Sequence, residues 1–378
     1  MGARLARAAA ACSILLTTSP AWAEGLGDIA LTQLEPSVAG DPFFTIASPF
    51  IGGHLKPGVS VLLDHASEPL KLSTGSTSTS LVGSQTWLHV GASLALWDRL
   101  LVGAVLPVVV AQGGDDPRVD SVTIASPEGA AIGDFRFSLR IRLVGEEADL
   151  FQASAGVLLH FPSGASGVFA GEGALRDTPQ IAVGGRHSFF VWSAAAGMLI
   201  RGSENPSAIS FGGGAAAVLW GDRLQVGPEI FGATPIQSVR PRAREVRSLE
   251  LDASTNLEVM LGVRGSLPLG FSVGAGAGFG LTDAIGTPAY RIVGSLGWSL
   301  GGAARVMAKA ADADEDGIED GADACPYAFG PSSSEPNRAG CPVVDSDEDG
   351  VPDHEDGCPN EPGDSAAGAK GCPAGAGG

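Results

Sequence analysis

Hydrophobic and polar residues alternate with a period of two in several stretches of this chain. From Phe135 to Leu143 every odd-numbered position is apolar and every even-numbered position is polar. From Phe271 to Phe279 the same alternation places glycines on one face, where we expect little space. Residues 224–226 and 257–263 repeat the pattern more weakly. This period predicts β-strands that present apolar side chains to lipid and small or polar ones to a lumen.

Twelve segments of this kind can be placed along the chain. They cover residues 58–65, 86–97, 100–111, 133–144, 151–161, 179–187, 189–201, 208–220, 223–234, 255–266, 270–281 and 289–300. Long polar connections, such as 66–85 and 112–132, alternate with tight turns such as Asp98-Arg99. Outer-membrane barrels have short periplasmic turns and longer outer loops. We therefore expect an all-β fold, a transmembrane antiparallel β-barrel of about 12 strands, with both chain ends in the periplasm.

A soluble all-β sandwich is the alternative fold, because its strands also alternate. Glycine and other small residues recur on one face of the predicted strands, while Phe, Leu and Trp recur on the other. This distribution favours the barrel over the sandwich. No apolar run beyond the first 23 residues is as long as a membrane helix.

The first 23 residues predict a signal peptide. An apolar run from Ala8 to Leu16 follows two arginines, and Ala21-Trp22-Ala23 fits the small-x-small cleavage pattern. A membrane anchor needs about 18 to 20 apolar residues, so this run is too short to be one. Lipidation is disfavoured because most of the apolar run follows Cys12 instead of preceding it. We expect export and cleavage before Glu24.

The composition changes near Ala310. Residues 311–378 contain 17 acidic and two basic side chains, and the whole chain has a formal net charge of −19. The chain before this point is rich in Gly, Ala, Val, Leu and Phe, whereas the tail is rich in Asp, Gly, Pro and Cys. We place a domain boundary here. Nothing resembles the basic patch that a nucleic-acid-binding protein needs, so that class is set aside.

The acidic tail repeats itself with a period of 33 residues, and both copies read D-x-D-x-D-G-x-x-D-x-x-D-x-C-P. Ca²⁺ binds six to eight oxygens, and a loop with carboxylates at positions 1, 3, 5, 9 and 12 and a carbonyl at position 7 encloses it. The alternative is a solvated acidic linker. The spacing predicts two calcium sites, with ligands Asp312, Asp314, Asp316, Ile318, Asp320 and Asp323 in the first copy and Asp345, Asp347, Asp349, Val351, Asp353 and Asp356 in the second.

The two copies resemble thrombospondin type 3 repeats, from Asp312 to near Pro373. The resemblance implies a calcium-filled stalk with little hydrophobic core. It also implies similarity to bacterial OmpA-family proteins, in which such repeats join an outer-membrane barrel to a peptidoglycan-binding domain. This sequence stops at Gly378 without that domain, so we do not expect peptidoglycan binding. The expected organisation is a signal peptide at 1–23, a barrel at 24–305 and two repeats at 311–378.

Cleavage of the signal peptide would leave four cysteines, Cys325, Cys341, Cys358 and Cys372. An even number in an oxidising compartment favours disulfides, and the lack of a CxxC pair argues against zinc. We favour local bridges, Cys325–Cys341 and Cys358–Cys372, over a bridge between the repeats such as Cys341–Cys358. Closing a loop of about 15 residues stabilises a fold by about 3 kcal/mol, which matters where little core can form.

Enzyme chemistry is hard to find in this sequence. The candidate catalytic pairs of neighbouring His and Ser residues are His160 with Ser163 and His187 with Ser188. Each pair falls at the end of a predicted strand, where polar residues are ordinary. A nucleophilic site also needs a third group that orients the base. We therefore do not expect an enzyme.

The alternation directs charged side chains into the predicted lumen, where they could pair into a plug or line a wet pore. They are Arg136, Arg140, Arg142, Arg223 and Arg264, with Glu229 and Glu258. We expect a structural outer-membrane protein of a Gram-negative bacterium, with periplasmic calcium repeats and an adhesive or envelope-linking role. Its expected partners are outer-membrane lipid, calcium and an envelope or surface protein. A porin-like channel for small solutes is the alternative.

Overall fold

The computed structural model describes residues 29–74, 77–119, 122–146, 149–187, 189–203, 205–236, 254–300, 313–314, 316–318, 320–333, 337–363 and 370–373. The chain divides into two compact units, Met1–Arg305 and Val306–Gly378, and each is described by itself. Within the described ranges no helix is long and apolar enough to cross a membrane.

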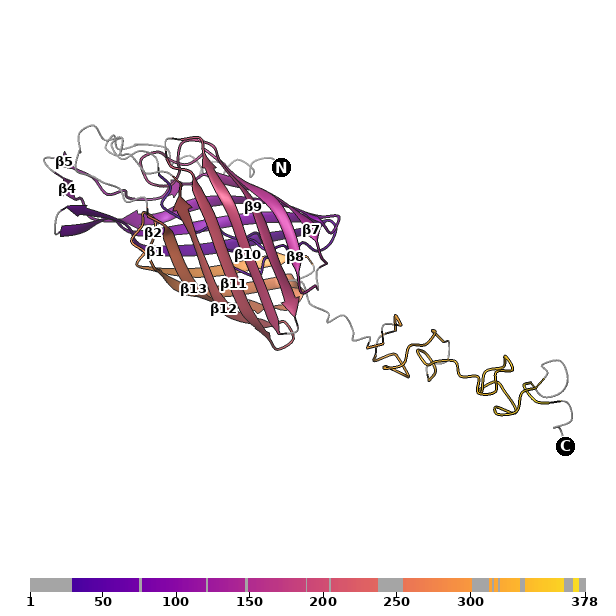
Figure 1. Ribbon diagram of the computed structural model, residues 1–378. Helices are drawn as coiled ribbons and strands as arrows, with labels where there is room; N and C mark the ends of the chain where they lie inside the picture. The colour runs from indigo at the N-terminus through magenta and orange to yellow at the C-terminus, as the bar shows by residue number, and fades with distance from the viewer. Residues whose placement is uncertain are drawn as a thin grey trace, which may run out of the picture. The chain divides into compact units, whose positions relative to one another are not determined.

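The first unit is a closed antiparallel β-barrel (Figure 1). Twelve long strands form the ring in chain order, which confirms the predicted fold class and all twelve predicted strand segments. The strands are β1 (Lys56–Thr74), β2 (Thr77–Leu96), β3 (Leu100–Gly113), β7 (Phe135–Val144), β8 (Gln152–Phe161), β9 (Arg176–His187), β10 (Phe190–Arg201), β11 (Ala208–Leu219), β12 (Leu224–Pro235), β13 (Asn256–Ser266), β14 (Phe271–Gly280) and β15 (Tyr290–Ser299).

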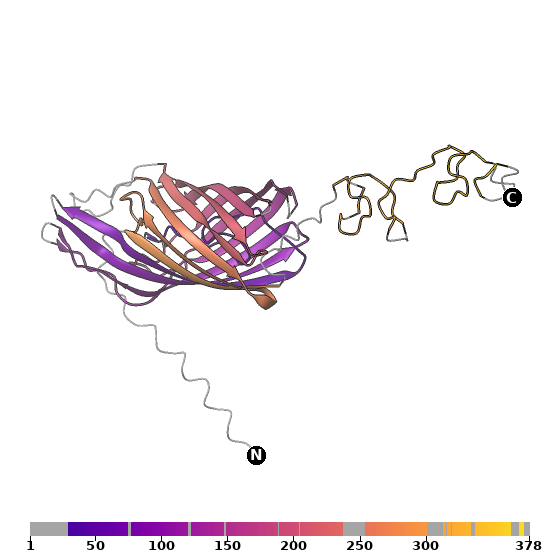
Figure 2. The ribbon, with the colours of Figure 1, turned by 90° about the horizontal axis from the view of Figure 1, so that it is seen from below.

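The ring closes where the first strand pairs with the last. Antiparallel pairs between β1 and β15 run from Gly58 with Ser299 to Ser67 with Tyr290. Figure 2 shows the strands of opposite walls enclosing an interior. Short elements lie in the connections, namely β4 (Arg118–Val119), β5 (Val122–Thr123), β6 (Ala131–Ile132) and a 3-10 turn at Pro268–Gly270. Closure leaves no sheet edge along the ring, as a lipid environment requires.

The barrel is apolar outside, and its interior contains buried charged side chains around a hydrophobic cluster. On β7, Leu139 and Ile141 are exposed, whereas Arg136 and Arg140 are buried. Exposed aromatic side chains lie in the short turns between strands, including Trp97, Trp220 and Phe189. A soluble sandwich would bury its apolar face, so that alternative is excluded. The exterior fits hydrocarbon, with aromatic residues at the level of the lipid headgroups.

The first long connection differs from the expectation. A polar loop at 66–85 was expected, but β1 continues to Thr74 and β2 starts at Thr77. A membrane-crossing strand needs about 9–11 residues, so the hairpin extends beyond the rest of the barrel. Its extension is held by a hydrophobic cluster that the strand pattern alone does not reveal: Leu31, Leu70, Leu72, Leu81, Val82 and Phe169.

Residues 29–55, which precede β1, lie inside the barrel and are here called the lumen segment. At the long-loop end Leu31 N–H donates to the carbonyl of Phe169 (3.3 Å). At the short-turn end Gly53 N–H donates to the Asp98 carboxylate (2.7 Å). The first described residues therefore lie at the long-loop end, whereas the expectation that both chain ends lie on the short-turn side concerns residues outside the described ranges and stays a prediction. It was based on the strands alone, and a segment without period-two alternation gives no strand signal.

Glycines on the inner face of the wall make room for the lumen segment. A methyl group added at Gly214 would lie 2.7 Å from the ring of Phe43. One added at Gly262 or Gly274 would lie 2.8 Å from the ring of Phe44. Both phenylalanines belong to the main buried cluster of the barrel. The inward glycines seen in the sequence therefore have a packing role.

We expect Gly214→Ala to destabilise the barrel by about 1–3 kcal/mol, because the new methyl group overpacks against Phe43. Gly213→Ala is the matched control, since the nearest atom to its added Cβ is 3.8 Å away. The free energies of unfolding in urea, measured in detergent micelles, compare the two variants. Equal stabilities would contradict the packing role of Gly214.

An epitope inserted just ahead of Ile29 is expected to bind antibody on intact cells. The lumen segment begins at the long-loop end, which faces outwards in outer-membrane barrels. An epitope inserted at Gly221, in the short turn between β11 and β12, should bind only after the outer membrane is permeabilised. Protection of both epitopes on intact cells would refute this orientation of the lumen segment.

Candidate functional site

Wall side chains hydrogen-bond to the backbone of the lumen segment. Glu229 on β12 accepts hydrogen bonds from the N–H groups of Phe44 (2.8 Å) and Thr45 (2.9 Å). Arg264 on β13 donates to the carbonyl of Phe43 (2.9 Å), and its guanidinium lies 4.2 Å from the centre of the Phe44 ring. Buried backbone groups need such partners. Side chains of the wall therefore provide what strand pairing provides elsewhere in the barrel.

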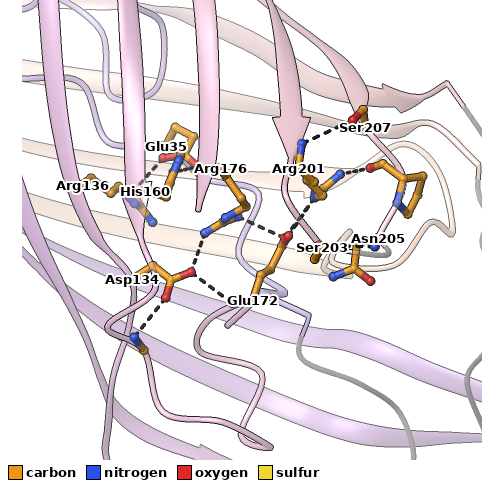
Figure 3. Close-up of polar contacts among 12 residues, drawn as sticks. Glu35, Asp134, Arg136, His160, Glu172, Arg176, Arg201, Ser203, Asn205 and Ser207 are labelled. Carbon is orange, nitrogen blue, oxygen red and sulfur yellow. Dashed lines mark hydrogen bonds and ion pairs between the residues drawn. The ribbon is translucent and has the colours of Figure 1, made fainter. Parts of the chain in front are cut away.

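Two carboxylates of the lumen segment pair with arginines of the wall. Arg140 donates to both oxygens of Asp41 (3.0 Å each). Glu35 lies 2.9 Å from a terminal nitrogen of Arg136 and 3.1 Å from Nε2 of His160 (Figure 3). Both arginines project from the inner face of β7, as the alternation predicts. Neither acidic partner was expected from the sequence.

Two further ion pairs, which share Arg291, join three strands of the wall. Arg291 on β15 donates to Asp64 on β1 and to Glu258 on β13, with shortest N–O distances of 2.7 Å. All three side chains are buried. Glu258 thus points inwards as predicted, and its negative charge is compensated within the wall itself.

One of the arginines predicted to face the lumen does not lie there, and a second lies at the short-turn end of its strand. Arg223 is exposed, because β12 starts at Leu224 and leaves it in the turn. Arg142, close to the end of β7, donates to the carbonyl of Asp98 in a neighbouring turn. The alternation of apolar and polar residues predicts the face of the strand on which each arginine lies, but it does not predict where the strands end.

A second ionic network lies towards the long-loop end (Figure 3). Arg176 pairs with Asp134 at 3.0 Å and with Glu172 at 3.1 Å, and Arg201 pairs with Glu172 at 2.9 Å. It ties the connection 162–175 to β9 and β10. Arg176 and Arg201 are in phase with the inner faces of their strands, so a longer search for alternation would have found them. Asp134 lies just before β7, within the predicted segment 133–144 and in phase with its inner face, whereas Glu172 lies in a loop and gives no such signal.

The His and Ser residues considered as catalytic pairs have other partners. His160 contacts Glu35, and the hydroxyl of Ser163 accepts a hydrogen bond from Phe135 N–H (2.8 Å). His187 is exposed at the end of β9. Ser188 lies outside the described residues.

In the tail, the two repeats form loops with the same internal hydrogen bonds. Asp316 Oδ1 accepts from Ile318 N–H (2.8 Å), and Asp349 Oδ1 accepts from Val351 N–H (2.9 Å). The glycine at the sixth position of each loop has a positive φ, 91° at Gly317 and 88° at Gly350. The backbone turn that the spacing predicts is therefore present in both copies.

Three carboxylates of each loop have oxygens within 4.8 Å of one another: Asp314, Asp316 and Asp323, and Asp345, Asp347 and Asp349. Asp320 and Asp353 accept hydrogen bonds from the N–H groups of Ala313 (2.8 Å) and Ser346 (2.7 Å). Asp312 lies outside the described residues. The structure thus brings together part of each predicted ligand set.

Several loop carboxylate oxygens have no partner. One buried oxygen without a hydrogen bond belongs to each of Asp314, Asp323, Asp347 and Asp356. Desolvation raises the pKa of Asp314 and of Asp347, and neighbouring aspartates raise it further, against the opposing effect of a backbone hydrogen bond. A divalent cation would satisfy these oxygens and offset the repulsion.

Two disulfide bonds cross-link the tail. Cys325 is bonded to Cys341 and Cys358 to Cys372, at sequence separations of 16 and 14. This is the local pairing that the sequence favoured. Each bridge follows the aspartate loop of its own repeat.

Comparisons with known proteins concern both units. Residues 310–330 match the thrombospondin type 3 repeat. No curated protein sequence matches the chain. A likeness to the OmpA family is not among these findings. The comparisons therefore support the repeat in the tail.

Solved structures similar to the barrel share little sequence with it. An outer membrane channel from Pseudomonas putida F1 is 12% identical, with 66% of this chain and 97% of that chain covered and a TM-score of 0.48. The KdgM porin is 6% identical, with coverages of 64% and 99% and a TM-score of 0.38. The translocator domain of the autotransporter NalP from Neisseria meningitidis is 10% identical, with coverages of 66% and 88% and a TM-score of 0.38.

The closed ring, the apolar exterior and the charged interior define an integral β-barrel protein of the outer membrane. Its C-terminal tail includes residues 310–330, which are similar to the thrombospondin type 3 repeat.

We expect Arg291→Gln to destabilise the barrel by about 3–5 kcal/mol, because it leaves Asp64 and Glu258 buried without their cation. Lys71→Gln is the control, since it removes an exposed pair with Glu68 and should cost at most about 1 kcal/mol. Urea unfolding of the two variants measures the difference. A similar, small effect of both substitutions would show that the Arg291 pair is solvated in the folded barrel.

Proposed function

We propose that this protein anchors a calcium-stiffened stalk in the outer membrane. The observation that carries the proposal is the repetition of one loop geometry in the tail, with unpartnered carboxylate oxygens at equivalent positions of both copies. The barrel would serve as the anchor and residues 311–378 as the stalk. Since β15 ends on the short-turn side, the stalk would extend into the periplasm.

Calcium would be held by the carboxylates of each loop together with one carbonyl, from Ile318 or Val351. The cation would remove the repulsion among the carboxylates and replace the hydrophobic core that the tail lacks. The two disulfides support this arrangement because each closes a short loop within one repeat. A stalk stiffened in this way would present its surface to an envelope or surface protein, in an adhesive or linking role.

The occupied lumen supports an anchoring role for the barrel. The lumen segment contacts β7 on one side of the ring and the adjacent strands β12 and β13 on the other side, so it lies across the interior. In this conformation a segment of the same chain fills the lumen of the barrel.

A channel for small solutes is the second candidate function. It is favoured by a cavity of about 140 Å³ between the lumen segment and the wall, whose largely apolar lining also contains the polar side chains of Arg136, Arg140 and Thr178. Conduction would require the lumen segment to move.

Calcium is expected to protect the tail of the full-length protein against protease, with half-maximal protection at about 0.1–1 mM. Asp316→Ala should weaken calcium binding by the first repeat about tenfold or more, and Asp349→Ala that by the second, which corresponds to about 1.4 kcal/mol. Limited proteolysis with intact-mass analysis in chelator and in calcium measures both effects. Mg²⁺ should substitute poorly because it requires tighter octahedral geometry.

Glu361→Ala is the matched control for these variants, because it removes an exposed acidic side chain outside both loops. It should leave protection unchanged, and the barrel should resist protease with or without calcium. Equal cleavage of the wild-type tail in chelator and in millimolar calcium would contradict the proposal of a calcium-stiffened stalk.

A further inference from the structure

We infer that the barrel encloses a path for small organic anions, and that two carboxylates of the lumen segment occupy positions at which such anions would bind. The inference rests on the channel candidate and adds a class of solute to it. Its basis is the set of contacts that Glu35 and Asp41 make with the wall.

Asp41 is held in the way that arginine binds a free carboxylate. The two terminal nitrogens of Arg140 each lie 3.0 Å from one oxygen of Asp41. A bidentate guanidinium contact of this kind can be made with any carboxylate that reaches the same position. Glu35 makes a comparable contact, with a guanidinium nitrogen of Arg136 and an imidazole nitrogen of His160. The wall thus offers two cationic positions that face carboxylates.

The lumen segment is separable from the wall. The twelve strands pair with one another around the full ring without it. Its contacts at the centre of the barrel are hydrogen bonds and ion pairs from side chains, together with a hydrophobic cluster in which five of its side chains, including Phe43 and Phe44, pack against the wall. None of these contacts is a strand pairing. Its displacement would therefore leave the hydrogen-bonded ring intact.

Displacement would change the charge of one part of the wall. Arg291 keeps Asp64 and Glu258, and Arg176 keeps Asp134 and Glu172, since all of these belong to strands or their connections. Arg136 and Arg140 would lose the carboxylates that face them in the lumen segment. Excess positive charge would then line the inner face of β7.

Space already lies beside these two arginines. The cavity of about 140 Å³ is bordered by both of them and by Glu35, and its other polar lining includes Ser138, Thr178 and Gln180. Hydrogen-bond donors and cations along a pore favour the passage of anions. The residues that hold the lumen segment would therefore also select the solute.

The test compares the full-length protein with a variant lacking residues 29–50 in planar bilayers under a potassium chloride gradient. Folding of each protein is checked by its heat-modifiable electrophoretic mobility. We expect the deletion variant to conduct and its reversal potential to shift towards the chloride equilibrium value. Added succinate, a dicarboxylate, should reduce the chloride current. In the deletion variant, Arg136→Gln with Arg140→Gln should abolish the shift and the block.

Arg118→Gln in the deletion variant is the matched control, because Arg118 is exposed in the connection between β3 and β7. It should leave both the reversal potential and the succinate block unchanged. A folded deletion variant that conducts nothing would overturn the channel candidate and this inference together. A conducting variant that prefers potassium, or shows no preference, would overturn the inference alone.

If the deletion variant does not fold, the same bilayer measurement is made on the full-length protein carrying Glu35→Gln and Asp41→Asn. This double variant keeps the lumen segment but weakens its two ion pairs with the wall. We expect more frequent chloride-selective openings than in the wild-type protein. Openings without chloride preference, or a folded protein with no increase in openings, would refute the inference.

Discussion

Hydrocarbon offers no hydrogen bonds, so every backbone group of a chain that crosses a membrane must find its partner within the protein. In this protein the requirement is met by pairing β15 with β1, which turns a sheet into a ring. Closure has two consequences. The strands must show an apolar face to lipid, and they must enclose an interior that something has to fill.

The interior is filled by the chain itself. The lumen segment has no strand partners, so its backbone groups are satisfied by side chains such as Glu229 and Arg264. Its aromatic rings fit against glycines on the wall, and its carboxylates meet arginines on β7. Charges removed from water are costly unless paired, which explains why buried arginines such as Arg140 and Arg291 lie beside carboxylates. A closed resting state and an anion path that opens when the segment moves are consistent with the same set of contacts.

The tail depends on a different source of stability. It has few apolar side chains and many carboxylates, so it cannot bury enough hydrophobic surface to fold by that means. Two disulfides and two aspartate loops take the place of a core. The membrane unit is held by closure and internal pairing, whereas the tail would be held by covalent bridges and a cation, so calcium should act on one and leave the other unchanged.

The sequence by itself determined the strands, the turns between most of them, and the loops of the tail. Alternation along β7 and β14 is a relation between residues two positions apart, and the aspartate spacing is a relation within a dozen residues, so both can be read locally. The long β1–β2 hairpin, the exposed position of Arg223 and the lumen segment could not be read in this way. Phe44 and Glu229 are 185 residues apart, and Asp41 and Arg140 are 99 apart. Only the closed ring brings these residues together. The position of the segment that fills the lumen depends on contacts across the barrel, and these contacts leave no periodic pattern in the sequence of that segment.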